Sequence, residues 1–69
     1  MIKKKAIIIS IAGTILTHRE KDLLIKGKPW GIILFKRNIL TFNQTKKLIY
    51  SIRATVKDSK FPILIDEEG

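Results

Sequence analysis

The chain has 69 residues, no cysteine, one histidine and a formal net charge of +8. This length allows at most one small domain, and the lack of cysteine excludes disulfide bonds and any zinc site built from cysteine and histidine. A domain of about 60 residues buries only about 60% of its unfolded surface, so a fold of this size without such cross-links is marginally stable.

Two interpretations fit the amino-terminal segment. Lys3–Lys5 and the apolar run Ala6–Leu16 resemble the charged and hydrophobic regions of an export signal. No small-x-small cleavage site follows, however, and the run is shorter than the ~20 residues of a membrane-spanning helix. An unbroken β-branched run is typical of a parallel sheet that is covered on both faces. We therefore expect a first buried strand over residues 6–11, with export as the alternative.

A short helix is expected next. Thr17 and Glu20 have the spacing of a capping box, in which each residue satisfies a backbone N–H group of the other. The helix should run from about His18 to Lys26 and end at Gly27, because glycine readily adopts the left-handed conformation that stops a helix. Its expected inward residues are Leu23 and Leu24.

A second apolar strand is expected over Gly31–Phe35, and residues 36–38 lead out of it. Thr41 and Gln44 form a second capping box. The helix that follows carries one inward stripe at helical spacing: Thr45, Leu48, Ile49, Ile52 and Val56. Its basic residues lie largely on the other, solvated side: Lys46, Lys47, Arg53 and Lys57.

The third expected strand, Phe61–Ile65, leads directly into an acidic cluster. The alternation of strands and helices predicts an α/β fold, a βαβαβ unit with a parallel sheet. Carboxylates at the carboxyl end of a buried strand lie where such folds bind and transform ligands. No glycine-rich phosphate motif follows any of the strands, so the pattern does not favour a dinucleotide site.

Several motifs, in this order and spacing, resemble the amino-terminal part of glycoside hydrolase family 3. They are Gly31–Asn38 (GIILFKRN), then Gln44, Leu48 and Ile52-Arg53 in the second helix, and Ile63–Gly69 (ILIDEEG). They look most like the bacterial β-N-acetylhexosaminidases of cell-wall recycling, with Leu16-Thr17 and Glu20 as a weaker match. The resemblance implies that residues 1–69 are the amino-terminal part of a (β/α)8 barrel of the TIM type, truncated after its first three strands.

The resemblance also implies an activity. Such enzymes hydrolyse terminal β-linked N-acetylglucosamine from peptidoglycan fragments in the cytoplasm, with retention and without a metal or organic cofactor. Retention requires a carboxylate nucleophile and a general acid/base. In this family the nucleophilic aspartate and the acid/base histidine lie beyond the end of this chain, so the 69-residue chain alone is expected to be inactive. Asp66 matches a residue that hydrogen bonds to sugar hydroxyls and is the expected substrate-binding residue, while Glu68 and Gly69 match positions that shape the following turn.

The acidic cluster has other interpretations. Asp66 and Glu68 are two residues apart and share a face of an extended segment, which suggests an acid and nucleophile pair. Neighbours at one strand end cannot readily flank a sugar from opposite sides, however, as a retaining pair ~5–5.5 Å apart must. A hard-cation site that also includes Glu67 lacks further ligands, so no metal is expected. A solvated acidic terminus is the alternative, and it is favoured for the isolated chain.

Four further residues are candidates for a functional role. His18, the only histidine, suggests an acid/base, but its place in a first helical turn favours the surface. Arg37 and Asn38 leave the second strand at the same edge as Asp66, where they either line a pocket or hydrogen bond to the loop backbone; we favour the second. Trp30 precedes the second strand at the opposite edge, which favours packing over sugar stacking.

Two other functions stay open. The runner-up is a small basic protein that binds nucleic acid or an anionic membrane surface, which salt-dependent binding by a folded monomer would identify. The charges of this chain are spread out, however, and its aromatic residues are not interleaved with the basic residues. We therefore expect neither nucleic acid nor membrane as a partner. The third is half of a split enzyme, in which a downstream-encoded chain supplies the remainder of the barrel.

Overall fold

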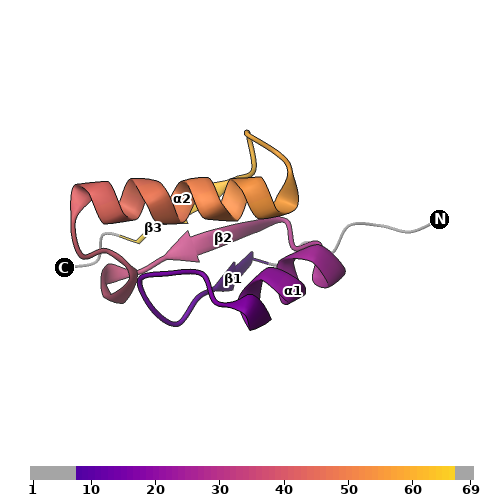
Figure 1. Ribbon diagram of the computed structural model, residues 1–69, viewed down its shortest axis with the longest axis horizontal. Coiled ribbons are helices and arrows are strands. Elements are labelled where there is room, and N and C mark those ends of the chain that lie inside the picture. Colours follow the sequence, from indigo (N-terminus) through magenta and orange to yellow (C-terminus); the bar gives the residue numbers. More distant parts are fainter. Residues whose placement is uncertain (1–7, 67–69) are drawn as a thin grey trace.

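The computed structural model describes residues 8–66. Strands and helices alternate along the chain as β1 (Ile8–Ser10), α1 (His18–Gly27), β2 (Gly31–Leu34), the 3-10 turn η1 (Lys36–Asn38), α2 (Phe42–Val56) and β3 (Ile63–Ile65). The sheet has the order β1-β2-β3, and both strand pairs are parallel (Figure 1). The predicted βαβαβ unit is therefore confirmed, whereas its membership of an eight-stranded barrel stays a prediction.

The strands are shorter than expected. The first was predicted over residues 6–11, but the described strand covers 8–10, and residues 6 and 7 lie outside the described range. The second ends at Leu34 instead of Phe35, and the third begins at Ile63 instead of Phe61. The residue at which a strand ends depends on the local backbone conformation, and a run of apolar residues does not reveal it. After β2, for example, the chain turns directly into η1.

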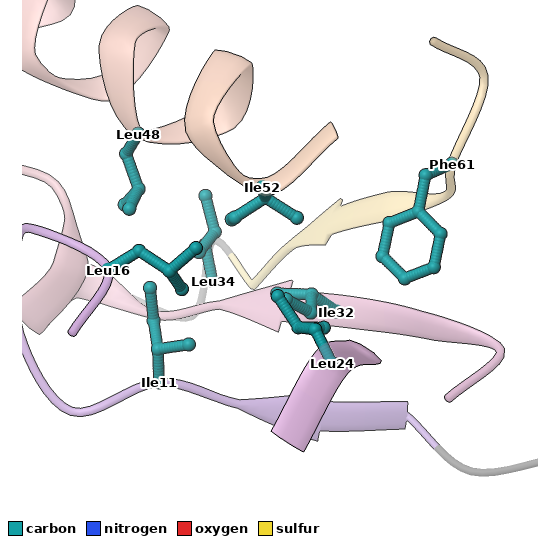
Figure 2. Close-up of a cluster of buried hydrophobic side chains, with 8 residues drawn as sticks. All are labelled: Ile11, Leu16, Leu24, Ile32, Leu34, Leu48, Ile52 and Phe61. Carbon is teal, nitrogen blue, oxygen red and sulfur yellow. The ribbon is translucent and has the colours of Figure 1, made fainter. Parts of the chain in front are cut away.

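One face of the sheet and both helices share a single core. The register aligns Ile9, Ile32 and Ile63, and side chains alternate between faces along each strand. Leu24 of α1 and Ile52 of α2 contact this face together (Figure 2). The buried cluster comprises Ile11, Leu16, Leu24, Ile32, Leu34, Leu48, Ile52 and Phe61.

The other face of the sheet is not covered by either helix. Ile8 and Leu64 point to this side and are 41% and 44% exposed. The expectation of a sheet covered on both faces is therefore wrong for the described residues. The physical reason is that successive right-handed crossovers bring their helices to the same side of a parallel sheet.

Both predicted capping boxes are present, and each fixes the start of a helix. The hydroxyl oxygen of Thr17 accepts the backbone N–H of Glu20, and that of Thr41 accepts the backbone N–H of Gln44. These bonds satisfy donors that the first turn of a helix otherwise leaves without partners. The α2 stripe is also as predicted, with Leu48 buried in the core.

Two details of α1 differ from the prediction. Leu24 is buried, but Leu23 is 56% exposed, because adjacent helical residues point about 100° apart and only one can face a narrow core. Gly27 is the last helical residue and not the left-handed stop. Lys28 takes that conformation, with φ of 45°, and its N–H bonds to Leu24 O.

The amino edge of the sheet is closed by a tight contact between β2 and the residue before β3. A Cβ atom on Gly31 would lie 2.9 Å from Pro62 O, so the position accepts only glycine without a shift. The backbone N–H of Ile32 donates to the same oxygen at 3.1 Å. Within residues 8–66 no helix has the length and apolarity needed to cross a membrane.

Candidate functional site at the carboxyl edge of the sheet

The carboxyl ends of the three strands meet at one edge of the sheet. There β1 leads into the β1–α1 loop, residues 11–17, while β2 leads into η1 and β3 leads into Asp66. Ligands of parallel α/β proteins bind at this edge, because the loops that leave the strands surround it. Arg37, Asn38 and Asp66 were predicted from the sequence to lie at this edge.

Asn38 makes the central hydrogen bonds of this edge. Its side chain is fully buried, and its Nδ2 donates to Ile11 O at 3.0 Å and to Gly13 O at 2.7 Å. Its Oδ1 accepts the backbone N–H of Phe35 at 2.8 Å. One amide therefore joins the end of β2 to the loop after β1, and all of its bonds go to backbone.

Arg37 reaches in the same direction. Its Nε and Nη2 donate to Ile11 O at 3.3 and 3.2 Å, and Nη2 also lies 3.4 Å from Ser10 Oγ. The guanidinium carbon lies 5.0 Å from the ring centroid of Phe35, a cation–π distance. Arg37 and Asn38 thus both hydrogen bond to the β1–α1 backbone, the arrangement that the sequence favoured over pocket lining.

Gln44 connects α2 to the same loop. Its Oε1 accepts the backbone N–H of Leu40 at 2.7 Å, and its Nε2 donates to Thr14 O at 2.7 Å and to Asn38 O at 3.0 Å. The sequence identified this residue as half of a capping box and as part of the family resemblance, but not as a contact of the β1–α1 loop. The bond to Thr14 spans 30 residues, and no local spacing could have predicted it.

Glu20 holds the loop from the side of α1. One carboxylate oxygen accepts the backbone N–H of Ala12 at 2.9 Å, and the other accepts the backbone N–H of Thr17 at 3.0 Å. Partial burial acts to raise the pKa of Glu20, but the hydrogen bonds from Thr17 and Ala12 outweigh it and hold the pKa below its usual value of 4.5. The bond to Ala12 is a second contact that the capping pattern did not reveal.

Asp66 follows β3 at this edge and is partly buried. Its backbone N–H donates to Leu34 O at 2.9 Å, which fixes the start of the acidic segment beside the end of β2. Glu67, Glu68 and Gly69 lie outside the described residues, so the pairing of Asp66 with Glu68 and the cation site are not tested. Among residues 8–66 no cluster of three or more His, Cys, Asp or Glu side chains is placed to hold a metal ion.

The two remaining candidates are exposed side chains. His18 is exposed at the first turn of α1, and Trp30 is 50% exposed at the amino edge, immediately before β2. The structure therefore brings Arg37, Asn38 and Asp66 to one edge and leaves the histidine and the tryptophan apart from Asn38 and its loop contacts.

Comparison with known proteins gives this edge a context. No protein-family model matches the chain. A protein named Beta-hexosaminidase from Stenotrophomonas maltophilia is 38% identical over 63 residues, and relatives of the same name from Xanthomonas campestris pv. campestris and Idiomarina loihiensis are 36% and 40% identical over 63 residues. Each match covers 91% of this chain. The chain is a homologue of these beta-hexosaminidases.

The homology covers only part of the relatives. The chain spans 18–19% of the length of these three beta-hexosaminidases. The glycoside hydrolase resemblance found in the sequence is thereby supported, since the curated relatives are named for that activity. The carboxyl edge therefore lies in a chain that is similar to part of these beta-hexosaminidases, and its residues are considered in that light below.

Proposed function

We propose that this chain forms the first three strands of a (β/α)8 barrel in a family 3 β-N-acetylhexosaminidase. Homology to beta-hexosaminidases over 91% of the chain supports the enzyme class. The strand order β1-β2-β3 supports the architecture, because in a barrel of this type each strand pairs in parallel with the next one along the chain. The whole enzyme removes terminal β-linked N-acetylglucosamine from peptidoglycan fragments, and its proposed compartment is the cytoplasm.

The position of Asp66 is the observation that carries this proposal. Its backbone is tied to Leu34 O, so its side chain leaves the sheet at the edge where parallel α/β folds bind ligands. A carboxylate there accepts hydrogen bonds from sugar hydroxyls. Such bonds to a charged acceptor contribute about 1.5–3 kcal/mol each. Arg37 and Asn38 support the site by fixing the neighbouring loop.

The described residues alone do not assemble the catalytic pair that retention needs. Glu20 accepts backbone N–H groups at the start of α1, Asp22 pairs with Lys26 at 3.2 Å, and Asp58 accepts the backbone N–H of Lys60. We place the nucleophile and the acid/base in the remainder of the barrel, so we expect the 69-residue chain alone to be inactive.

A segment exchange tests the proposal. The 63 matched residues of the Stenotrophomonas maltophilia Beta-hexosaminidase are replaced by their counterparts from this chain, and hydrolysis of a chromogenic β-N-acetylglucosaminide is measured. We expect an active chimera. The substitution Asp66→Asn in it should lower kcat/KM by about 10–100-fold through the lost hydroxyl contact.

The matched control is Asp58→Asn in the same chimera, because Asp58 is exposed in the loop after α2. It should leave kcat/KM within about twofold. A folded chimera without activity, an Asp66→Asn variant as active as its parent, or hydrolysis by the 69-residue chain alone would each contradict the proposal.

A further inference from the structure

Side chains alternate between the two faces of the sheet, and the alternation continues past the end of β2. Ser10 aligns with Ile33 and Leu64 on the face that neither helix covers. Leu34 is buried in the core on the other face, and Phe35 follows it with extended backbone, at φ of −110° and ψ of 175°. Phe35 therefore lies on the uncovered side.

Two charged side chains reach the same side at the carboxyl edge. Asp66 follows Ile65, which pairs in register with the core residue before Phe35, so the same alternation brings Asp66 to the uncovered side. The guanidinium carbon of Arg37 lies 5.0 Å from the Phe35 ring centroid, and its Nη2 lies 3.4 Å from Ser10 Oγ. The carboxyl end of the uncovered face thus carries a row formed by a cation, an aromatic ring and a carboxylate.

The cation of this row is anchored without being neutralised. Nε and Nη2 of Arg37 donate to Ile11 O at 3.3 and 3.2 Å. Within residues 8–66 no carboxylate forms an ion pair with it, since the ion pair there joins Lys26 and Asp22. The side chain is exposed, and none of its bonds to the described residues uses Nη1. Anchoring of the loop and contact with a ligand are therefore compatible.

The two charges lie at different distances along the edge, which indicates the ligand that could meet both. Neighbouring strands are about 4.8 Å apart, so the ends of β1 and β3 are separated by about 10 Å across β2. Arg37 lies beside Ser10 of β1, and Asp66 follows β3. A ligand whose terminal sugar is bound by Asp66 therefore reaches Arg37 with the group that follows this sugar. A guanidinium is best matched by a carboxylate, which accepts hydrogen bonds and carries the opposite charge.

We propose that Arg37 is a specificity-determining residue that binds a carboxylate on the aglycone, the part of the substrate that follows the terminal sugar. The inference rests on the proposed function, in which the uncovered face becomes the inside of a (β/α)8 barrel and substrate binds at its carboxyl end. Peptidoglycan fragments carry carboxylates outside their terminal N-acetylglucosamine, so the proposed substrate supplies the group. Because the guanidinium is already anchored, binding costs little further side-chain entropy.

Two substrates that differ only in charge test the proposal. One is a nitrophenyl β-N-acetylglucosaminide with a carboxylate on the phenyl ring, and the other is its methyl ester. Both are given to the chimera described above, and their kcat/KM values are compared. We expect the acid to be preferred about tenfold, because hydrogen bonds between ionised groups are stronger than those to a neutral ester.

Three substitutions in the chimera separate ligand contact from a purely structural role. Arg37→Gln should remove the preference for the acid, whereas Arg37→Lys, which keeps the charge but not the planar donors, should retain about threefold. Weakened contacts with the β1–α1 loop affect both substrates alike, so the ratio of the two kcat/KM values reports the ligand contact. The control Lys60→Gln removes the same charge from an exposed residue before β3, at the amino edge, and should change the ratio by less than about twofold.

A second measurement uses the 69-residue chain itself and does not depend on activity. The NMR signal of the Arg37 Nε–H group, identified by its absence from the spectrum of Arg37→Gln, is followed as each compound is added. We expect it to shift with the acid and not with the ester. This measurement decides the inference if the chimera hydrolyses neither compound, an outcome that would contradict the proposed function.

The inference is overturned if an active chimera hydrolyses the acid and the ester equally well. It is also overturned if Arg37→Gln lowers kcat/KM for both by the same factor, which would leave Arg37 a structural role only, or if Lys60→Gln reduces the preference as much. In the binding measurement, an Arg37 signal that shifts with neither compound, or equally with both, has the same meaning.

Discussion

The two edges of the sheet are held together by different kinds of contact. At the carboxyl edge, the side chains of Asn38, Gln44 and Glu20 bond to backbone groups of the β1–α1 loop. At the amino edge, the backbone of Gly31 packs directly against Pro62, and Phe61 is buried in the core. Polar side chains order the first edge, and close packing orders the second.

The two kinds of contact should respond differently to substitution. A loop fixed by directional hydrogen bonds keeps one geometry, which is what a binding edge requires, but each bond depends on one amide or carboxylate. A closely packed edge tolerates exchange among apolar side chains but not added volume. Substitutions that remove bonds should therefore damage the carboxyl edge, and substitutions that add atoms should damage the amino edge.

The largest expected effect is at Asn38. Asn38→Ala removes the side-chain partner of Gly13 O and of the Phe35 N–H at a partly buried place, and one partner of Ile11 O, which Arg37 still contacts. An unsatisfied buried polar group costs about 1–3 kcal/mol, so the free energy of unfolding should fall by about 3 kcal/mol or more. Urea unfolding followed by circular dichroism measures this loss.

Asn43→Ala is the control for this measurement. Asn43 is exposed in the first turn of α2, and its replacement should change the free energy of unfolding by less than about 0.5 kcal/mol. Equal effects of the two substitutions would break the comparison between the edges, because the carboxyl edge would then not depend on the buried amide.

An intermediate effect is expected at Gly31, which tests the amino edge. Gly31→Ala places a Cβ atom 2.9 Å from Pro62 O, so β2 and the start of β3 must separate. Overpacking of this kind costs about 1–3 kcal/mol. The same unfolding measurement on Gly27→Ala is the control, since nothing lies within 4 Å of a Cβ there and its φ is not positive. That variant should gain up to about 1 kcal/mol, and a loss similar to that of Gly31→Ala would contradict the packing argument.

Local patterns in the sequence predicted most of the fold. Both capping boxes, the inward stripe of α2 and the parallel βαβαβ order follow from spacings of a few residues, and the structure contains all of them. Two of the errors were also local. Leu23 and Leu24 are adjacent, and apolarity does not say which one faces the core; Gly27 and Lys28 are adjacent, and composition favoured the glycine as the left-handed residue.

The candidate site was predicted only in outline. Arg37, Asn38 and Asp66 were assigned to one edge because each follows a strand, and parallel strands end together. The bonds of Asn38 to Ile11 and Gly13 join residues 27 and 25 apart in the chain. Such partners are set by the packing of the whole sheet, so no short motif indicates them. The sugar-binding role of Asp66 stays a prediction.

The smallest expected effect is at Glu20, and it sharpens the comparison because it concerns a single bond of the carboxyl edge. Glu20→Gln keeps an oxygen for the backbone N–H of Thr17 but places an NH₂ group where the carboxylate accepted the N–H of Ala12. Loss of one such bond costs about 1 kcal/mol at neutral pH.

The loss of stability in Glu20→Gln should also depend on pH. Because the pKa of Glu20 is lowered in the fold, ionised Glu20 stabilises the protein above its unfolded pKa, and this contribution disappears as the pH falls through the lower, folded value.

Unfolding of the parent chain and of Glu20→Gln should therefore be compared from about pH 7 to about pH 3. The other carboxylates are common to both proteins, so their effects cancel in the difference. We expect the parent to be more stable at neutral pH and the difference to shrink once the pH drops below the usual glutamate pKa of 4.5. A difference that is constant with pH would mean that the charge of Glu20 does not hold the β1–α1 loop. The carboxyl edge would then depend on the side chains of Asn38, Gln44 and Arg37.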